Sequence, residues 1–149
     1  MQLTQKEASL LKDLKDQEQL CIDKYSKHAQ CASDPQLKTL FEGIAGTERQ
    51  HFDTLCKIEG GTVPTVEDPS GKALPTFKAT YSTETENKKN DCYLCTDLLT
   101  TEKHASHLYD TCIFEFKDQE VRKVLSAIQT EEQQHGKSIW DYMSANGMY

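Results

Sequence analysis

The sequence lacks a long hydrophobic run. Nothing in its 149 residues approaches the roughly 20 consecutive apolar residues of a membrane-spanning helix, so we expect no membrane partner. Met1 leads into a polar segment, so we expect no secretory signal and a cytoplasmic location. Positive charge is also scarce, because 17 Lys and Arg face 24 Asp and Glu. The net charge of −7 argues against nucleic acid as a partner.

A second Cys-x-x-Cys motif is missing too. Cys92-x-x-Cys95 stands alone, which excludes a tetrathiolate site of paired motifs. Without an export signal, the even number of cysteines favours reduced thiols over a disulfide framework. We interpret most of them as small core residues, with a thiol function as the alternative. The six cysteines are Cys21, Cys31, Cys56, Cys92, Cys95 and Cys112.

The chain contains an internal repeat. A shift of 84 residues aligns its two halves without a gap, and apolar positions tend to meet apolar ones. Two copies of one helical hairpin are the simplest interpretation, within a single domain over residues 1–149. The identical pairs include Glu18 with Glu102, Tyr25 with Tyr109, Glu48 with Glu132, and His51 with His135.

The first hairpin is expected over residues 4–59. Thr4-x-x-Glu7 is a capping box, and apolar residues then recur at steps of three and four. The helix breaks at Ser33, and Asp34 followed by Pro35 is a strong start for the next one. A Gly-Gly pair at 60–61 ends the second helix.

The second hairpin is expected over residues 83–146. Thr83-x-x-Glu86 predicts a capping box at its start, Asp118 caps its second helix, and Gly147 ends it. Between the hairpins, residues 60–82 hold three prolines and show no sustained period, which predicts a long crossover. The sequence therefore predicts an all-α, antiparallel four-helix bundle with one long crossover between helices 2 and 3, the connection of ferritin-like folds.

Polar residues interrupt the apolar stripes at matching heights. Glu18 precedes the break at Ser33 by 15 residues and Glu48 follows it by 15, and Glu102 and Glu132 flank Lys117 in the same way. In an antiparallel hairpin such positions lie level, about 22 Å from the turn at 1.5 Å per residue. Four glutamates should therefore meet in one layer, with a histidine one turn after each glutamate of the second and fourth helices.

Such a layer predicts a dinuclear metal site. A buried, unpaired carboxylate costs several kcal/mol, and two divalent cations would balance four negative charges. Carboxylate and imidazole ligands suit iron, with manganese or zinc as alternatives, and one Glu from each of two helices plus Glu-x-x-His from the other two is a known di-iron arrangement. A single Glu-x-x-His is usually a solvated helix face, but here it occurs twice at the same spacing. The predicted ligands are Glu18, Glu48, His51, Glu102, Glu132 and His135.

Two tyrosines share the ligand stripes. Tyr25 and Tyr109 stand seven residues after Glu18 and Glu102, two turns along the same face. They are either core residues with satisfied hydroxyls, or residues behind the metal ligands that bind a ligand carboxylate or serve as an electron relay. The remaining histidines, 28, 104 and 107, are off this register and are expected at the surface or beside the site.

The chain resembles the ferritin-like superfamily, and more closely its rubrerythrin-like and spore coat F-type members. The coat F likeness is densest in the second half, in Asp97-Leu98-Leu99, Glu102-Lys103-His104, Tyr109, Glu131-Glu132 and the ending from Tyr142-Met143 to Gly147-Met148-Tyr149.

The resemblance implies roles for the six ligands. It makes Glu48 and Glu132 the carboxylates that bridge two metals, Glu18 and Glu102 terminal carboxylates, and the histidines the caps of one metal each. The absence of a rubredoxin module implies a separate electron donor, such as a rubredoxin-type protein. Position 105, where a further carboxylate could lie one turn beyond Glu102, is Ala105, a departure that weakens the case for rubrerythrin-style peroxidase chemistry.

Three functions follow from these patterns. The leading hypothesis is a non-haem di-iron carboxylate protein, an oxidase or peroxidase acting on hydrogen peroxide or dioxygen, with a homodimer as a further expectation. The second is a spore coat-associated structural protein whose metals brace the bundle, and the third is iron storage. Whether the chain is an enzyme stays open at this point.

Overall fold

The computed structural model describes residues 1–149 and is all-helical, which confirms the expected class. It has four long helices, one short 3-10 helix and no strand. None of these helices carries a segment both long and apolar enough to cross a membrane. The elements are α1 (Gln5–Cys31), α2 (Pro35–Glu59), η1 (Pro69–Gly71), α3 (Glu86–Glu115) and α4 (Gln119–Ala145).

The helix ends lie where local capping chemistry predicts. The capping box of Thr4 and Glu7 is formed, and the side chains of Asp34 and Asp118 accept hydrogen bonds from the first backbone N–H groups of α2 and α4. After α2 and α4 the chain turns at Gly61 (φ 93°) and Gly147 (φ 65°), a conformation that glycine adopts without strain.

The start of α3 differs from the prediction. Thr83 does not cap this helix; the side chain of Thr85 accepts from Lys88 N, so α3 begins at Glu86. Several capping residues follow one another here, and local preference alone does not select between them. The segment before these residues is held by a tertiary contact, because the backbone N–H groups of Thr80 and Tyr81 both donate to Asn146 Oδ1.

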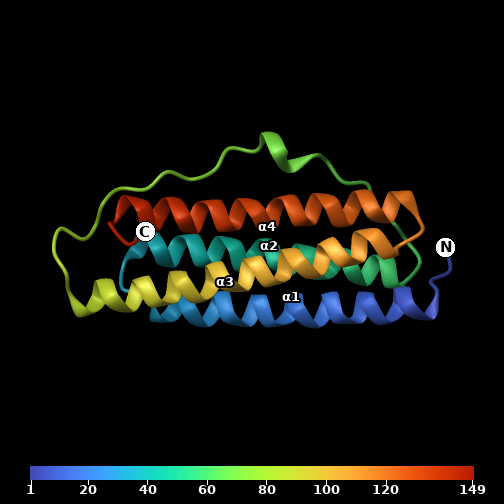
Figure 1. The fold of residues 1–149 in the computed structure, drawn as a ribbon, viewed down its shortest axis with the longest axis horizontal. Coiled ribbons are helices and arrows are strands. Elements are labelled where there is room, and N and C mark those ends of the chain that lie inside the picture. The colour runs from blue at the N-terminus through green and yellow to red at the C-terminus, as the bar shows by residue number, and fades with distance from the viewer.

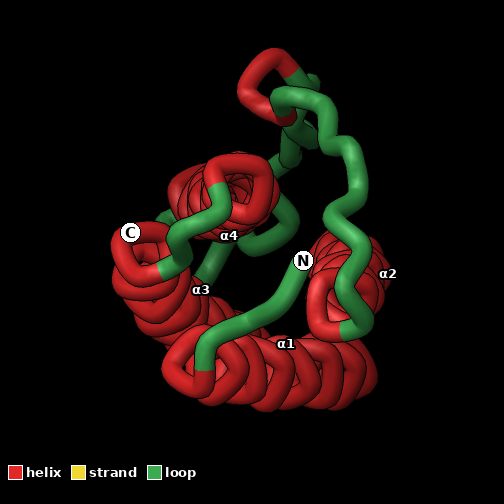
Figure 2. Tube along the Cα trace, turned by 90° about the vertical axis from the view of Figure 1, so that its right-hand side faces the viewer, coloured by secondary structure: helices red, strands yellow, loops and turns green.

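The four helices lie side by side along one long axis (Figure 1). In this view α2 runs back along α1, and α4 runs back along α3. The main packing is α1 on α2 and α3 on α4, with α1 also against α3, whereas α2 and α4 have much less contact. The crossover passes outside the bundle on the side of α2 and α4 (Figure 2), where Gln134 donates to the carbonyl of Pro69 at 2.6 Å.

A polar layer divides the hydrophobic core into two clusters. One cluster of 13 buried residues includes Tyr25 and Phe41, and the other, of 11 buried residues, includes Tyr109 and Leu125. The shift of 84 residues maps one cluster largely onto the other, so the bundle has an approximate two-fold symmetry that reflects the repeat.

Candidate metal centre

The six predicted ligands lie together in the layer between the two apolar clusters. Each helix contributes: Glu18 from α1, Glu102 from α3, a Glu-x-x-His pair from α2 and another from α4. All four glutamates are at most 2% exposed, and His51 and His135 are 3% and 8% exposed. The expected convergence of these residues is therefore observed, while their role as metal ligands stays a prediction.

The first half of the cluster surrounds His51. Its Nδ1 lies 3.0 Å from Glu132 Oε1, 3.6 Å from Glu18 Oε1 and 3.7 Å from Glu48 Oε2. One ligand atom from each of these four residues falls within 4.8 Å of all the others. Three carboxylates and one imidazole nitrogen thus converge on one point.

The second half repeats this arrangement around His135. Its Nδ1 lies 2.9 Å from Glu48 Oε1, 3.4 Å from Glu102 Oε1 and 3.9 Å from Glu132 Oε2. Glu48 and Glu132 belong to both halves, and each turns a different oxygen toward each histidine in these contacts. This is the arrangement that two bridging and two terminal carboxylates require.

The two tyrosines bind Glu18 and Glu102 across the bundle. Each of these two glutamates belongs to only one half of the cluster, and we call them the outer glutamates. Tyr25 of α1 donates its hydroxyl to Glu102 Oε1 at 2.6 Å, and Tyr109 of α3 donates to Glu18 Oε1 at 2.5 Å. Both rings are fully buried, and burial followed by the nearby glutamate charge raises each tyrosine pKa well above its ordinary value. These phenols therefore stay protonated and hold one oxygen of each outer carboxylate.

The fit of this cluster to metal ions can be tested on its unpartnered atoms. Buried polar atoms nearly always have hydrogen-bond partners. Eight buried side-chain atoms here have none, and all eight belong to the six predicted ligands. Each outer glutamate has its second oxygen free, both oxygens of Glu48 and Glu132 are free, and so is each histidine Nδ1. These are the atoms that two cations would bind, so the residues fit a dinuclear site.

Without cations, the electrostatics of the cluster favour bound protons on two of the glutamates and on both histidines. Burial, followed by the adjacent Glu48, raises the pKa of Glu18 to about 8. Burial and then Glu102 raise the pKa of Glu132. Burial lowers the pKa of both histidines, but the surrounding carboxylates outweigh it and raise each pKa well above its ordinary value. Metal binding would therefore displace protons from this cluster.

Glu131 is a site residue that the sequence analysis did not identify as one. The imidazole of His51 donates from Nε2 to Glu131 Oε1 at 3.2 Å, and Lys72 of the crossover lies 3.9 Å from the other oxygen. A carboxylate that accepts from Nε2 fixes the histidine tautomer and makes Nδ1 a stronger metal ligand. The Glu131-Glu132 pair gave a signal only through the family likeness, since Glu131 lies beside the stripe rather than on it.

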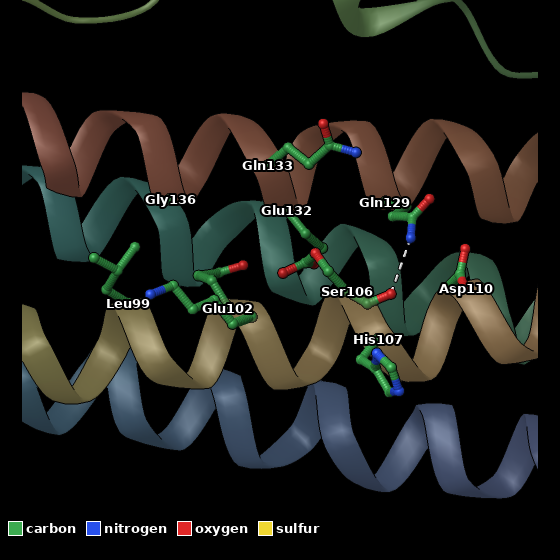
Figure 3. Close-up of a pocket in the computed structure, with 10 residues that line it drawn as sticks. Leu99, Glu102, Ser106, His107, Asp110, Gln129, Glu132, Gln133 and Gly136 are labelled. Carbon is green, nitrogen blue, oxygen red and sulfur yellow. Dashed lines mark hydrogen bonds between the residues drawn. The ribbon is translucent and has the colours of Figure 1, made fainter.

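An opening between α3 and α4 reaches the centre. A cleft of about 480 Å³ has Glu102 and Glu132 among its lining residues, together with Ser106 and Gly136. Figure 3 shows these two glutamates extending from α3 and α4 toward the space between the helices, with the side chain of Gln129 bonded to the carbonyl of Ser106. Small side chains thus leave one flank of the cluster accessible.

Two further clefts lie under the crossover, between α2 and α4. One, of about 600 Å³, is lined by His135, Glu131 and apolar residues such as Leu40 and Phe77. The other, of about 610 Å³, is lined by His51 and also by Glu131. The two histidines therefore line different clefts on this side of the bundle.

The cysteines lie apart from this chemistry. All six are free thiols, and Cys21, Cys95 and Cys112 are buried. Burial raises the pKa of each of these three thiols, that of Cys112 to about 11, so they pack as neutral side chains. Cys92 is half-buried and packs against one of the apolar clusters.

The fold and the cluster define an all-helical protein with a buried carboxylate–imidazole centre that is compatible with metal binding. Residues 90–149 match the family model described as the Coat F domain. This segment contains Glu102, Glu132 and His135, and the other three cluster residues lie outside it. No curated protein and no solved structure matches the chain. The wider likeness to ferritin-like and rubrerythrin-like proteins therefore stays a prediction.

Proposed function

We propose that this chain is a ferritin-like, antiparallel bundle that binds two divalent metal ions at its centre. The observation that carries the proposal is the set of eight buried atoms without hydrogen-bond partners, all on six residues that converge from four helices. A core does not retain so many unpartnered polar atoms unless something else satisfies them.

The contacts support one assignment of the ligands. Glu48 and Glu132 bridge, because both their oxygens are free and both belong to each half of the cluster. Glu18 and Glu102 are terminal, because a tyrosine occupies one oxygen of each. His51 and His135 each bind one metal through Nδ1.

Iron is the metal that we propose, with manganese or zinc as alternatives, since all three accept carboxylate and imidazole ligands. When bound, iron would supply redox chemistry toward dioxygen or hydrogen peroxide. The protein's own residues do the rest: the tyrosines orient the outer glutamates, the two apolar clusters exclude water above and below, and the α3–α4 cleft admits small molecules. Electrons would come from a separate donor, such as a rubredoxin-type protein.

The Coat F match supports a role with the spore coat, and it favours the structural function over the redox one. In that function the metals brace the bundle, because a ligand that binds only the folded state stabilises it. The α3–α4 cleft favours the redox function, since purely structural sites are usually closed whereas reactive ones keep an open position. We propose spore association for both, and an oxidoreductase activity as the finer hypothesis.

Anaerobic titration of the metal-free protein with ferrous ion tests the metal centre. We expect two ions per chain in the wild type and none or one in Glu48→Gln and Glu132→Gln. Glu42→Gln is the matched control, because Glu42 is an exposed glutamate on the same helix as Glu48. Loading of fewer than two ions in the wild type would contradict the dinuclear proposal.

Peroxide added to the loaded protein then separates the two functions. Oxidation of both irons, with repeated turnover once a reductant is supplied, supports the redox function. Loaded irons that stay ferrous, together with a higher melting temperature on loading, leave the structural function as the conclusion.

A further inference from the structure

The repeat leads one to expect two identical metal positions. Each half of the cluster has the same ligand types, the same tyrosine contact and nearly the same distances. The residues around the ligands, however, do not follow the shift of 84. Three independent differences point in the same direction.

The first difference is the group behind each histidine. Behind His51 lies Glu131, which accepts the hydrogen bond from Nε2. The position that corresponds to Glu131 on α2 is Thr47, which has no carboxylate. Thr47 donates to the carbonyl of Gly43 on its own helix, so it does not take the place of Glu131 behind His135.

The second difference is the flank of each hairpin. The cleft between α3 and α4 exists where Ser106 and Gly136 leave space beside Glu102. The corresponding residues of the first hairpin are Ile22 and Phe52, which are far larger. Ile22 is 7% exposed, and the Phe52 ring lies under the ammonium of Lys15 at 5.8 Å from its centroid, so this flank is filled.

The third difference is exposure. The side chain of His135 is 10% exposed and that of His51 is 4% exposed. The crossover adds to this difference, because Lys72 approaches the carboxylate that holds His51. The half around His51 is therefore held by Glu131 and closed on the flank of its own hairpin, while the half around His135 is less restrained and open on the flank between α3 and α4.

We propose that the two metal positions are inequivalent: the position of Glu18 and His51 holds its metal tightly, with Glu131 as its positioning residue, and the position of Glu102 and His135 is the open one, where a small exogenous ligand binds. This inference rests on the proposed dinuclear centre. The ligand class is a small molecule or anion that can pass between α3 and α4, such as azide as a probe.

Cobalt(II) titration, followed by the visible bands of the bound ion, tests the tight position. We expect two binding steps in the wild type, separated by at least about tenfold in Kd. Glu131→Gln should weaken the tighter step by about 10- to 100-fold and leave the weaker one within about twofold. Thr47→Glu, which places the missing carboxylate behind His135, should tighten the weaker step. Glu120→Gln, an exposed change on the same helix as Glu131, should alter neither.

Azide added to the cobalt-loaded protein tests the open position. One azide should bind and change the cobalt bands, and Gly136→Phe should weaken or slow that binding by about tenfold or more while two cobalt ions still bind. Gly136→Ala is the matched control, because a Cβ there meets only Leu99 Cδ1 at 3.6 Å, an ordinary contact. Phe52→Ala opens the other flank and should permit a second azide, which gives a test that does not depend on whether Gly136→Phe folds.

The outcomes separate the inference from the function on which it rests. If no cobalt binds, the dinuclear centre itself is wrong and the inference fails with it. If two ions bind with equal affinity, or if Glu131→Gln weakens both steps equally, the centre stands and the inequivalence is wrong. If azide binding ignores both Gly136→Phe and Phe52→Ala, the open position is wrong.

Discussion

Two kinds of buried carboxylate occur in this bundle, at its ends and at its centre. At the ends, Glu7 accepts from the backbone of Thr4 and Lys117, and Asp91 accepts from the backbone of Ser33 and Asp34. At the centre, the carboxylates of Glu48 and Glu132 accept no hydrogen bond at all. All four residues are at most 3% exposed, so burial alone does not distinguish them.

The difference lies in what satisfies each carboxylate. Glu7 and Asp91 correspond under the shift of 84, and each fastens the turn of the other hairpin to the start of its own. Their oxygens are occupied by N–H donors, so they stabilise the fold as they stand. The central carboxylates are directed at one another and at two histidines, which is favourable only with cations or protons between them. The same residue types therefore have hydrogen-bond donors at the ends of the bundle and lack them at its centre.

Removing the carboxylate of Asp91 should have the largest effect. This side chain accepts from Ser33 N, Asp34 N and the Tyr81 hydroxyl, at 2.9, 3.0 and 2.6 Å. Asp91→Ala leaves these donors without their partner, and we expect the free energy of unfolding to fall by about 3 kcal/mol in urea denaturation. The number of metals bound should not change.

Asp97→Ala is the control for that prediction. Asp97 lies on the same helix, partly exposed, and binds Lys24 and His28 at the surface. Its loss should cost less than about 1 kcal/mol. Equal losses in the two variants would show that the hydrogen bonds of Asp91 are not what distinguishes the ends of the bundle.

Neutralising a central carboxylate should raise the stability of the metal-free protein, whereas removing Asp91 lowers it. Glu132→Gln keeps the shape of the side chain and removes a charge that burial and Glu102 disfavour, so the metal-free protein should become more stable by about 1 kcal/mol. The same variant should lose the gain from metal, about 2.7 kcal/mol at a metal concentration of 100 Kd. Thermal melts with and without metal give both numbers. If the metal-free variant melts lower than the wild type, the central glutamates are structural residues like those at the ends.

Glu7 at the end of the bundle and Glu18 at its centre should also titrate with opposite sign. Although burial alone raises it, the hydrogen bonds from Thr4 and Lys117 bring the pKa of Glu7 below its ordinary value, so its contribution is present above about pH 4.5 and is lost as the pH falls. Burial and Glu48 raise the pKa of Glu18 to about 8, so the folded metal-free protein binds the extra proton between about pH 4.5 and 8, and stability falls as the pH rises through that window.

Urea denaturation of the metal-free protein across this range measures the difference. We expect the free energy of unfolding to be highest near pH 5 and to fall by on the order of 2 kcal/mol toward pH 8. Glu18→Gln should flatten that fall, and Glu7→Gln should flatten the loss below pH 4.5. A metal-free protein whose stability rises from pH 5 to 8 would contradict the assignment at the centre.

The sequence predicted the central layer because its geometry is local. Glu18 and Glu48 lie equally far from one turn, and helical periodicity places each of them on an apolar stripe, so their height and direction follow from the chain alone. The caps at Asp34 and Asp118 followed for the same reason, since a cap depends on its own few residues.

What the sequence did not predict depends on contacts between hairpins. The hydrogen bond from His51 to Glu131 joins α2 to α4, two helices with little mutual contact that no turn connects directly. In the sequence, nothing distinguishes Asp91 from other polar residues of its helix. Its role becomes visible only in the folded bundle, where the turn of the other hairpin donates to it. The cleft at Gly136 depends on how far α3 and α4 lie apart, which a periodic pattern does not encode.

The smallest expected effect comes from one substitution made at both places. Tyr142 donates to Asp34 at 2.7 Å near the end of the bundle, and Tyr25 donates to Glu102 at 2.6 Å beside the centre. Both hydroxyl groups are buried, so Tyr→Phe should cost about 1 kcal/mol at each position in the metal-free protein. With metal bound, the stability losses of the two variants should differ. The loss in Tyr142→Phe should stay the same, because Asp34 caps α2 and does not contact the central cluster. Tyr25→Phe should lose about 1 kcal/mol more, because the Tyr25 hydroxyl no longer orients the carboxylate of Glu102 so that its second oxygen points at the metal. Melting both variants with and without metal measures this difference, and equal responses would mean that Tyr25 is only a core residue with a satisfied hydroxyl.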